Sequence, residues 1–156
     1  MRARVQKWGN SLALRIPKSF ADEIGLGENS SIQLMIKEAL VEFQTAVRIW
    51  KDGSLPLAAL GHAYGIAGQK KEAQEILEKL LEMSKRTYVP AYDVAAVYVG
   101  LGENAQAFEW LSKAFEERSG FLIYINCDRR FDGLRSDPRY GALLKRIGLP
   151  LGAIKT

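Results

Sequence analysis

The side chains best suited to chemistry lie close to the start of the chain. They combine cationic, amide and hydroxyl groups with one aromatic ring: Arg4, Lys7, Trp8, Asn10, Ser11 and Arg15. Fixed cations and short polar donors bind backbone phosphates, and Arg and Asn also read base edges in the major groove. The set therefore predicts a DNA-binding site. The alternative is an ordinary exposed strand and turn.

A turn between two short strands is expected to position these residues. Gly9-Asn10 is typical of a tight turn, because both residues tolerate positive φ. After the turn, Leu12, Leu14 and Ile16 alternate with Ala13 and Arg15, as in a strand with one apolar face. Before it, apolar and basic residues alternate in the same way. We therefore expect a small hairpin.

The hairpin sequence resembles the SpoVT/AbrB-like DNA-binding domain, and in particular the MazE-type antitoxins. Residues Lys7–Ser11 match the family's turn, Arg15–Pro17 its strand end, 17–26 its helix and 31–36 its third strand. The resemblance implies a homodimer of two intertwined hairpins that binds a palindromic double-stranded operator. It also implies that Trp8 lies between protomers or at the edge of the DNA. We assign this segment to residues 1–37.

Charge is distributed unevenly along the chain. The net charge is +4, but residues 1–18 carry five basic groups and no acid, whereas residues 19–127 carry ten basic and fifteen acidic groups. A basic arm on an acidic body predicts a localised anion-binding face. The alternative is a solvated basic edge that keeps exposed strands from aggregating.

Composition limits the protein's class and compartment. A hydrophobic content of 47% is ordinary for a globular protein, and no apolar run approaches a membrane span of about 20 residues. The single cysteine, Cys127, excludes an internal disulfide framework. We expect a cytoplasmic protein without a membrane partner.

The sequence repeats itself beyond the hairpin. When it is shifted by 34 residues, Leu60 aligns with Val94, Tyr64 with Tyr98 and Gly68 with Gly102, and the match continues through Ala73, Leu77 and Lys79 with Ala107, Leu111 and Lys113. This period and the Leu-Gly-x-x-Tyr pattern resemble the tetratricopeptide repeat, which implies a helical solenoid. We expect helices at about 38–50, 54–67, 70–85, 89–101 and 104–118.

Residues 38–50 are ambiguous on their own. As a strand, Val41, Phe43 and Val47 would alternate with polar residues, and the fourth strand of the AbrB-like family would fall here. As a helix, Phe43, Ala46 and Trp50 would share one face. The repeat favours the helix, as the second helix of an incomplete repeat.

The end of the chain is expected to cap the solenoid. Asp137-Pro138 predicts an N-cap and a first-turn proline for a helix over about 138–147, which Gly148 would end. In the preceding segment, arginines alternate with aspartates: Arg129, Arg130, Arg135 and Arg139 with Asp128, Asp132 and Asp137. We interpret them as local ion pairs and caps. Residues 38–156 thus form the repeat region.

Within the repeats, His62 and Asp93 are the candidates for lining a protein-binding groove, while Tyr64 and Tyr98 are expected to pack between helices. His62 is the only histidine, so neither a histidine-based metal site nor a catalytic pair is supported. We expect no catalytic residue, metal or cofactor.

The sequence predicts a mostly α-helical protein with a small β segment, in which an AbrB-like swapped hairpin precedes a tetratricopeptide solenoid. The predicted function is that of a dimeric, antitoxin-like DNA-binding regulator that binds a protein partner through its repeats. The alternative is a protein-interaction scaffold whose hairpin serves only dimerisation or packing.

Overall fold

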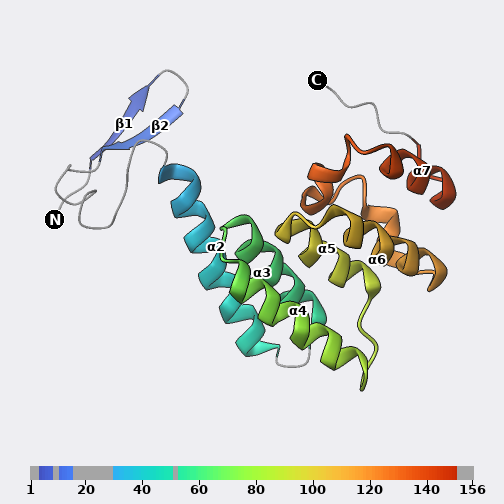
Figure 1. Cartoon of the computed structure of the whole chain (residues 1–156). Helices are drawn as coiled ribbons and strands as arrows, with labels where there is room; N and C mark the ends of the chain where they lie inside the picture. The colour runs from blue at the N-terminus through green and yellow to red at the C-terminus, as the bar shows by residue number, and fades with distance from the viewer. Residues whose placement is uncertain (1–3, 9–10, 16–29, 51–52, 151–156) are drawn as a thin grey trace. The chain divides into compact units, whose positions relative to one another are not determined.

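The computed structural model describes residues 4–8, 11–15, 30–50 and 53–150, with side chains from residue 37 onward. Its contacts divide the chain into two units, Met1–Lys37 and Glu38–Thr156, and each is described by itself (Figure 1). No helix in the described residues is long and apolar enough to cross a membrane.

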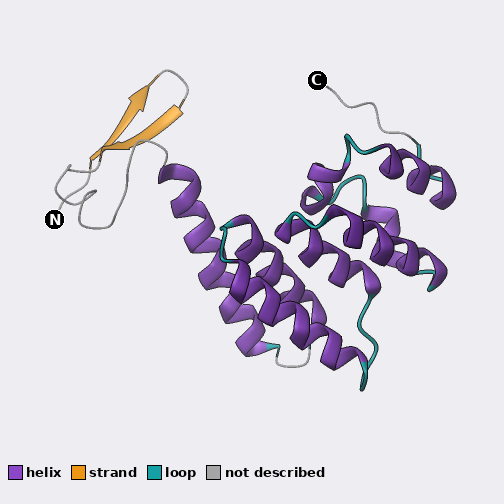
Figure 2. Ribbon diagram, in the orientation of Figure 1, coloured by secondary structure: helices purple, strands orange, loops and turns teal. Residues whose placement is uncertain are grey.

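The first unit contains a two-stranded antiparallel sheet. Strands β1 (Arg4–Trp8) and β2 (Ser11–Arg15) form this sheet (Figure 2). In their register Val5 lies opposite Leu14. Two strands alone are marginally stable in water. The intertwined dimer of such hairpins remains a prediction, and the helix expected over residues 17–26 lies outside the described residues.

The prediction of a third strand at residues 31–36 is wrong. These residues belong to helix α2 (Ser30–Ile49), which continues through the ambiguous segment. Ile32, Leu34 and Ile36 alternate, but Ile32, Ile36, Ala39 and Phe43 also follow a helical spacing, and residues 29–52 contain neither glycine nor proline. A six-residue alternation cannot compete with a helical period over twenty residues. The helix expected over 38–50 is confirmed.

The helices expected from the 34-residue period form two antiparallel pairs. They are α3 (Ser54–Ile66) with α4 (Lys70–Ser84), and α5 (Ala91–Leu101) with α6 (Asn104–Glu116). Gly68 and Gly102 follow the first helix of each pair with φ of 75° and 78°, a left-handed conformation that favours glycine. Helix α5 packs against α3, α4 and α6 (Figure 1). The expected helices are confirmed to within two residues at most ends.

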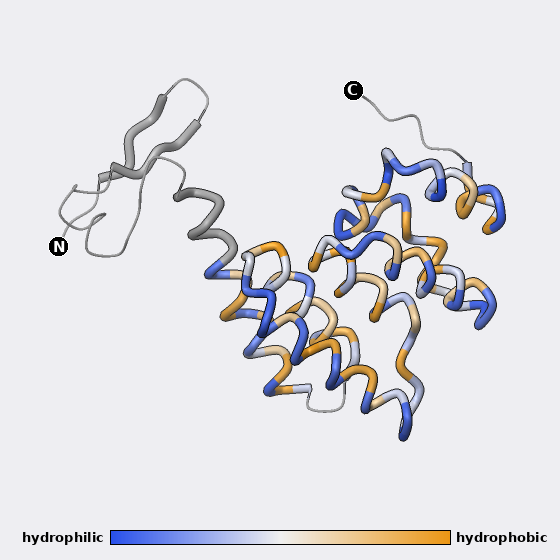
Figure 3. Tube along the Cα trace, in the orientation of Figure 1, coloured by the Kyte–Doolittle hydropathy of each residue, from blue (hydrophilic) through white to orange (hydrophobic). Residues whose placement is uncertain are grey.

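Two hydrophobic clusters hold the repeats together. One joins α3, α4 and α5 through Leu57, Leu77 and Val97. The other joins α5 and α6 to the C-terminal segment through Tyr92, Phe131 and other residues. Hydrophilic positions recur along α4 and α6, whereas α3 carries no charged residue (Figure 3). The first helix of each pair is therefore the more central one.

The C-terminal segment closes the second cluster. Short 3-10 helices η1 (Gly120–Tyr124) and η2 (Arg129–Leu134) lead into α7 (Pro138–Ile147). The carboxylate of Asp137 accepts the backbone N–H of Arg139, and Gly148 ends the helix with φ of 81°. Both the cap and the helix expected over 138–147 are confirmed.

Candidate nucleic-acid interface and repeat surfaces

The hairpin register determines which predicted DNA-binding residues lie together. Those in the described strands are Arg4, Lys7, Trp8, Ser11 and Arg15, whereas Asn10 lies outside the described residues. Arg4 pairs with Arg15 and Trp8 with Ser11, so these four positions share one face of the hairpin. Lys7 pairs with Leu12 and belongs to the opposite face. The predicted set is thus divided between two faces.

The pairing of Arg4 with Arg15 has an electrostatic consequence. Like charges directly opposite each other on neighbouring strands destabilise a sheet. A bound anion offsets this repulsion, and a phosphate diester accepts hydrogen bonds from guanidinium groups at both of its free oxygens. The DNA-binding role of these two arginines stays a prediction.

The repeats contain a second group of polar residues, centred on Asp128. Arg130 donates to both Asp128 carboxylate oxygens, with Nη2···Oδ2 at 2.6 Å and Nε···Oδ1 at 3.0 Å, and the Tyr92 hydroxyl donates to Oδ2 over 2.9 Å. Burial acts to raise the pKa of Asp128, but the hydrogen bonds and charge of Arg130 outweigh it and lower the pKa. Burial raises the pKa of Tyr92, and the neighbouring carboxylate adds to this effect. Asp128 is therefore the ionised acceptor of the group.

His62 and Asp93 lie close to this group and are both buried. Asp93 is 1% exposed, and its Oδ2 accepts a hydrogen bond from the Ser54 hydroxyl over 2.7 Å. Burial raises the pKa of Asp93. Burial and the nearby Arg130 charge lower the pKa of His62, which favours a neutral imidazole. These two side chains expose little surface that a partner could contact. Their burial argues against the protein-binding groove predicted at His62 and Asp93, which stays a prediction.

The structure also bears on the predicted packing of Tyr64 and Tyr98 and on the predicted ion pairs. Tyr98 packs between helices, with its ring stacked on Trp110, and the Tyr64 hydroxyl accepts from the Gln44 amide over 2.7 Å. The predicted ion pairs are found too: Asp128 with Arg130, Asp132 with Arg129 and Arg135, and Asp137 with Arg139.

The sequence did not indicate that Tyr92 reaches the carboxylate of Asp128. A signal existed, because Tyr92 and Asp93 replace Ala58 and Ala59 of the preceding repeat. The larger, polar residues at these positions indicate that α5 packs against a different kind of neighbour from α3. That neighbour is η2.

The described residues contain no group of three or more His, Cys, Asp or Glu side chains that could hold a metal ion. Cys127 is a free, exposed thiol.

Two family models each match one segment of the chain. Residues 5–38 match the family model of MazE, the antidote-toxin recognition family of bacterial antitoxins. Residues 57–87 match the tetratricopeptide repeat family. The predicted fusion of a MazE-like segment to a tetratricopeptide repeat is thus confirmed. No curated protein and no solved structure matches the chain.

Proposed function

We propose that this chain is a non-enzymatic, antitoxin-like regulator that binds operator DNA as a homodimer and a protein partner through its repeats. The proposal is carried by one observation: the MazE match begins at residue 5 and covers the hairpin from there on, including Arg15, which lies opposite Arg4 in the strand register. This match supports a DNA or toxin interaction, and the repeat match supports a protein partner.

In the proposed mechanism the arginine pair binds phosphates while Asn10 and Ser11 position the turn against the duplex. Phosphate contacts fix the register of a protein on DNA, and base contacts provide the specificity. A two-fold dimer presents this surface twice, which matches a palindromic site. Such a function places the protein in the cytoplasm.

The alternative, a protein-interaction scaffold, is favoured by helix α2. This helix occupies residues 30–49, which include the third strand expected at 31–36 and the place where the fourth strand of the AbrB-like family would fall. In that case the hairpin serves dimerisation or packing, and the repeats provide the function.

Fluorescence anisotropy separates these two functions. The full chain is titrated into a labelled duplex from upstream of its own gene and into a scrambled duplex of equal length. We expect the upstream duplex to bind at least about a hundredfold more tightly. The Arg15→Ala substitution should weaken that binding by about tenfold or more, because each chain loses one cation opposite Arg4.

The matched control is Arg48→Ala, since Arg48 is an exposed arginine of the repeat region whose removal changes the net charge equally. Equal, salt-sensitive binding to both duplexes would contradict the regulator and favour the scaffold. Equal losses for the two variants would show that Arg15 acts only through net charge.

A further inference from the structure

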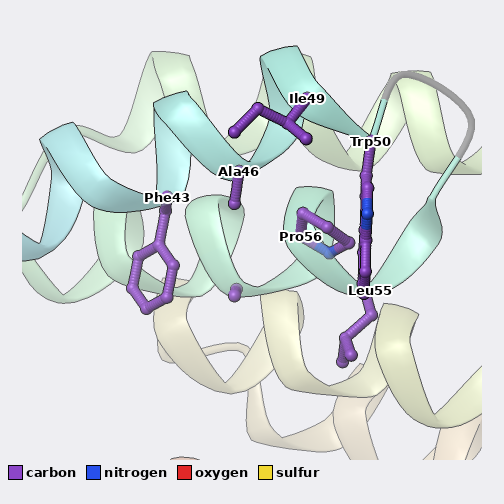
Figure 4. Close-up of a pocket in the computed structure, with 7 residues that line it drawn as sticks. Phe43, Ala46, Ile49, Trp50, Leu55 and Pro56 are labelled. Atoms are coloured by element: carbon purple, nitrogen blue, oxygen red, sulfur yellow. The ribbon is translucent and has the colours of Figure 1, made fainter.

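Two hollows in the described repeat region differ in chemistry. The hollow beside α2 has a volume of about 370 Å³ and only apolar residues in its lining, and Figure 4 shows two of them, Phe43 and Trp50, on either side of Ala46. The α6–α7 groove has a volume of about 190 Å³ and a mixed lining: Phe108, Ser112, Arg139, Ala142, Leu143 and Arg146. The polar groups of this groove carry information on the charge of a ligand, which an entirely apolar lining does not.

The α6–α7 groove combines an apolar floor with two arginines. Phe108 and Leu143 form the floor and are buried, with 7% and 4% of their surface exposed. Arg139 and Arg146 are seven residues apart in α7, which is close to two helical turns. They therefore share one face of the helix and lie about 10 Å apart along its axis.

Aromatic rings of α6 hold both arginines in place. The guanidinium carbon of Arg139 lies 4.4 Å from the centroid of the Phe108 ring, and that of Arg146 lies 4.6 Å from the centroid of the Phe115 ring. Cation–π contacts of this kind restrict long side chains. Less conformational entropy is then lost when the two guanidinium groups bind an anion.

The two arginines differ in how far their charge is compensated. Arg139 donates through Nε and Nη2 to the Asp137 carboxylate, over 3.0 and 2.7 Å. No ion pair of Arg146 is found within the described part of the chain, and α7 itself contains no acidic residue. The Ser112 hydroxyl also lines the groove and adds a neutral donor. Arg146 is therefore the main anion-binding group of the groove.

We propose that the α6–α7 groove binds an acidic segment of a protein partner, in which an apolar side chain lies between two carboxylates. The apolar side chain covers Phe108 and Leu143, and one carboxylate binds Arg146. The other accepts from Nη1 of Arg139, which the pair with Asp137 does not use. In an extended segment, residues three positions apart are about 10 Å apart, which matches the spacing of the arginines along α7. The sequence Glu-Leu-x-Glu has this arrangement.

The chemistry of the groove favours this occupant over two others. A nucleic acid supplies phosphates, but the rings of Phe108 and Phe115 are already covered by guanidinium groups and do not offer a surface on which bases stack. Residues 151–156 contain no acidic side chain and so do not match the two arginines. The inference rests on the proposed protein-binding role of the repeats, and it assigns that role to α6 and α7.

Fluorescence anisotropy with a labelled peptide tests the proposal. The probe is fluorescein-Gly-Ser-Glu-Leu-Ser-Glu-Ser-Gly, and the control peptide carries Gln in place of both Glu residues. The full chain should bind the probe saturably and the control peptide at least about tenfold more weakly, because the charge-assisted hydrogen bonds are lost. Arg146→Ala should weaken binding of the probe by about tenfold or more. Arg48→Ala removes an equal charge from an exposed position of α2 outside the groove and should bind like the unchanged chain.

An exchange of charge separates direct contact from lost packing on Phe115. Arg146→Glu should lose affinity for the probe and gain affinity for one of the two peptides in which a single Glu is replaced by Lys. Circular dichroism establishes that each variant is folded. Absence of saturable binding, equal losses for Arg146→Ala and Arg48→Ala, or no exchange in the folded Arg146→Glu variant would overturn the proposal.

Titration of the same variants with the upstream duplex tests the competing class of ligand. If Arg146→Ala weakens DNA binding as much as Arg15→Ala does, the groove contacts nucleic acid and the proposal is wrong. Unchanged DNA binding by Arg146→Ala, together with failed peptide binding, would reject this inference while leaving the regulator intact.

Discussion

At the scale of single residues, the Asp128 group connects the C-terminal cap to the repeats. Tyr92 comes from α5, while Asp128 and Arg130 come from the segment that begins η2. Phe131 adds to this contact, because its ring lies 4.8 Å from that of Tyr92 between centroids. The group thus replaces, at the end of the solenoid, the packing that a following repeat would supply.

Replacing Tyr92 with Phe tests this connection. The variant keeps the ring but removes a hydrogen bond of 2.9 Å to an ionised carboxylate, in a place that is 2% exposed. Hydrogen bonds to charged groups contribute about 1.5–3 kcal/mol. Because Arg130 still compensates Asp128, we expect the free energy of unfolding in urea to fall by about 1–2 kcal/mol.

The Tyr98→Phe variant provides the control for that loss. The Tyr98 ring packs on Trp110, and no hydrogen bond of its hydroxyl is found within the described part of the chain. Its unfolding free energy should change by less than about 0.5 kcal/mol. A similar loss in both variants would contradict the role given to the Asp128 group.

The local ion pairs were predictable from sequence, and the buried polar links were not. Asp137 and Arg139 are two residues apart, so an N-cap signal is enough to pair them. Tyr92 and Asp128 are 36 residues apart, and their hydrogen bond depends on where the cap folds back. The effect of Arg130 on the pKa of His62 was equally unpredictable, since Arg130 also belongs to the cap segment.

At the scale of elements, close contact between α3 and α5 depends on two glycines. A Cβ atom on Gly65 would lie 2.3 Å from the backbone carbon of Gly100 and 2.5 Å from its oxygen. Backbone atoms cannot move away independently, so Gly65→Ala must separate the helices. Overpacking of this kind costs about 1–3 kcal/mol, which outweighs the higher helix propensity of alanine, about 1 kcal/mol at most.

We therefore expect Gly65→Ala to lower the melting temperature of the repeat region clearly, as measured by circular dichroism at 222 nm. Gly133→Ala is the matched control, because nothing lies within 4 Å of a Cβ atom built there and its φ is not positive. That variant should change the unfolding free energy by less than about 0.5 kcal/mol. An unchanged melting temperature for Gly65→Ala would show that the helices separate at little cost.

The 34-residue period made most helices predictable from the sequence. It gave no help for the first part of α2, which has no repeated counterpart. Gly68 and Gly102 end equivalent helices, so one copy of the pattern supported the other. No second copy exists for residues 31–36, and their six-residue alternation favoured a strand. The longer-range 3.6-residue periodicity determined the outcome instead.

At the scale of the whole molecule, basic residues and exposed apolar residues are concentrated in different parts of the sequence. The first eighteen residues carry five basic groups and no acid, while the hollow beside α2 is lined without any charged residue. The proposed electrostatic attraction to DNA and the apolar surface beside α2 therefore belong to different parts of the chain. Salt weakens electrostatic attraction to DNA.

This difference yields a quantitative expectation for DNA binding. Each phosphate neutralised by a cation contributes about −0.9 to the slope of log K against log salt concentration. If only the five basic groups in residues 1–18 contact phosphate, one chain can reach a slope of at most about −4.5 and a dimer about −9. A measured slope steeper than −4.5 in anisotropy titrations between 50 and 200 mM KCl, taken as about a fourfold salt range, thus indicates two hairpins on one duplex.

Arg15→Ala identifies the source of that slope. If its guanidinium contacts phosphate, the magnitude falls by about 0.9 for one bound chain and about 1.8 for a dimer, whereas Arg48→Ala leaves the slope unchanged. A slope insensitive to Arg15 would assign the attraction to other groups and remove the arginine pair from the interface.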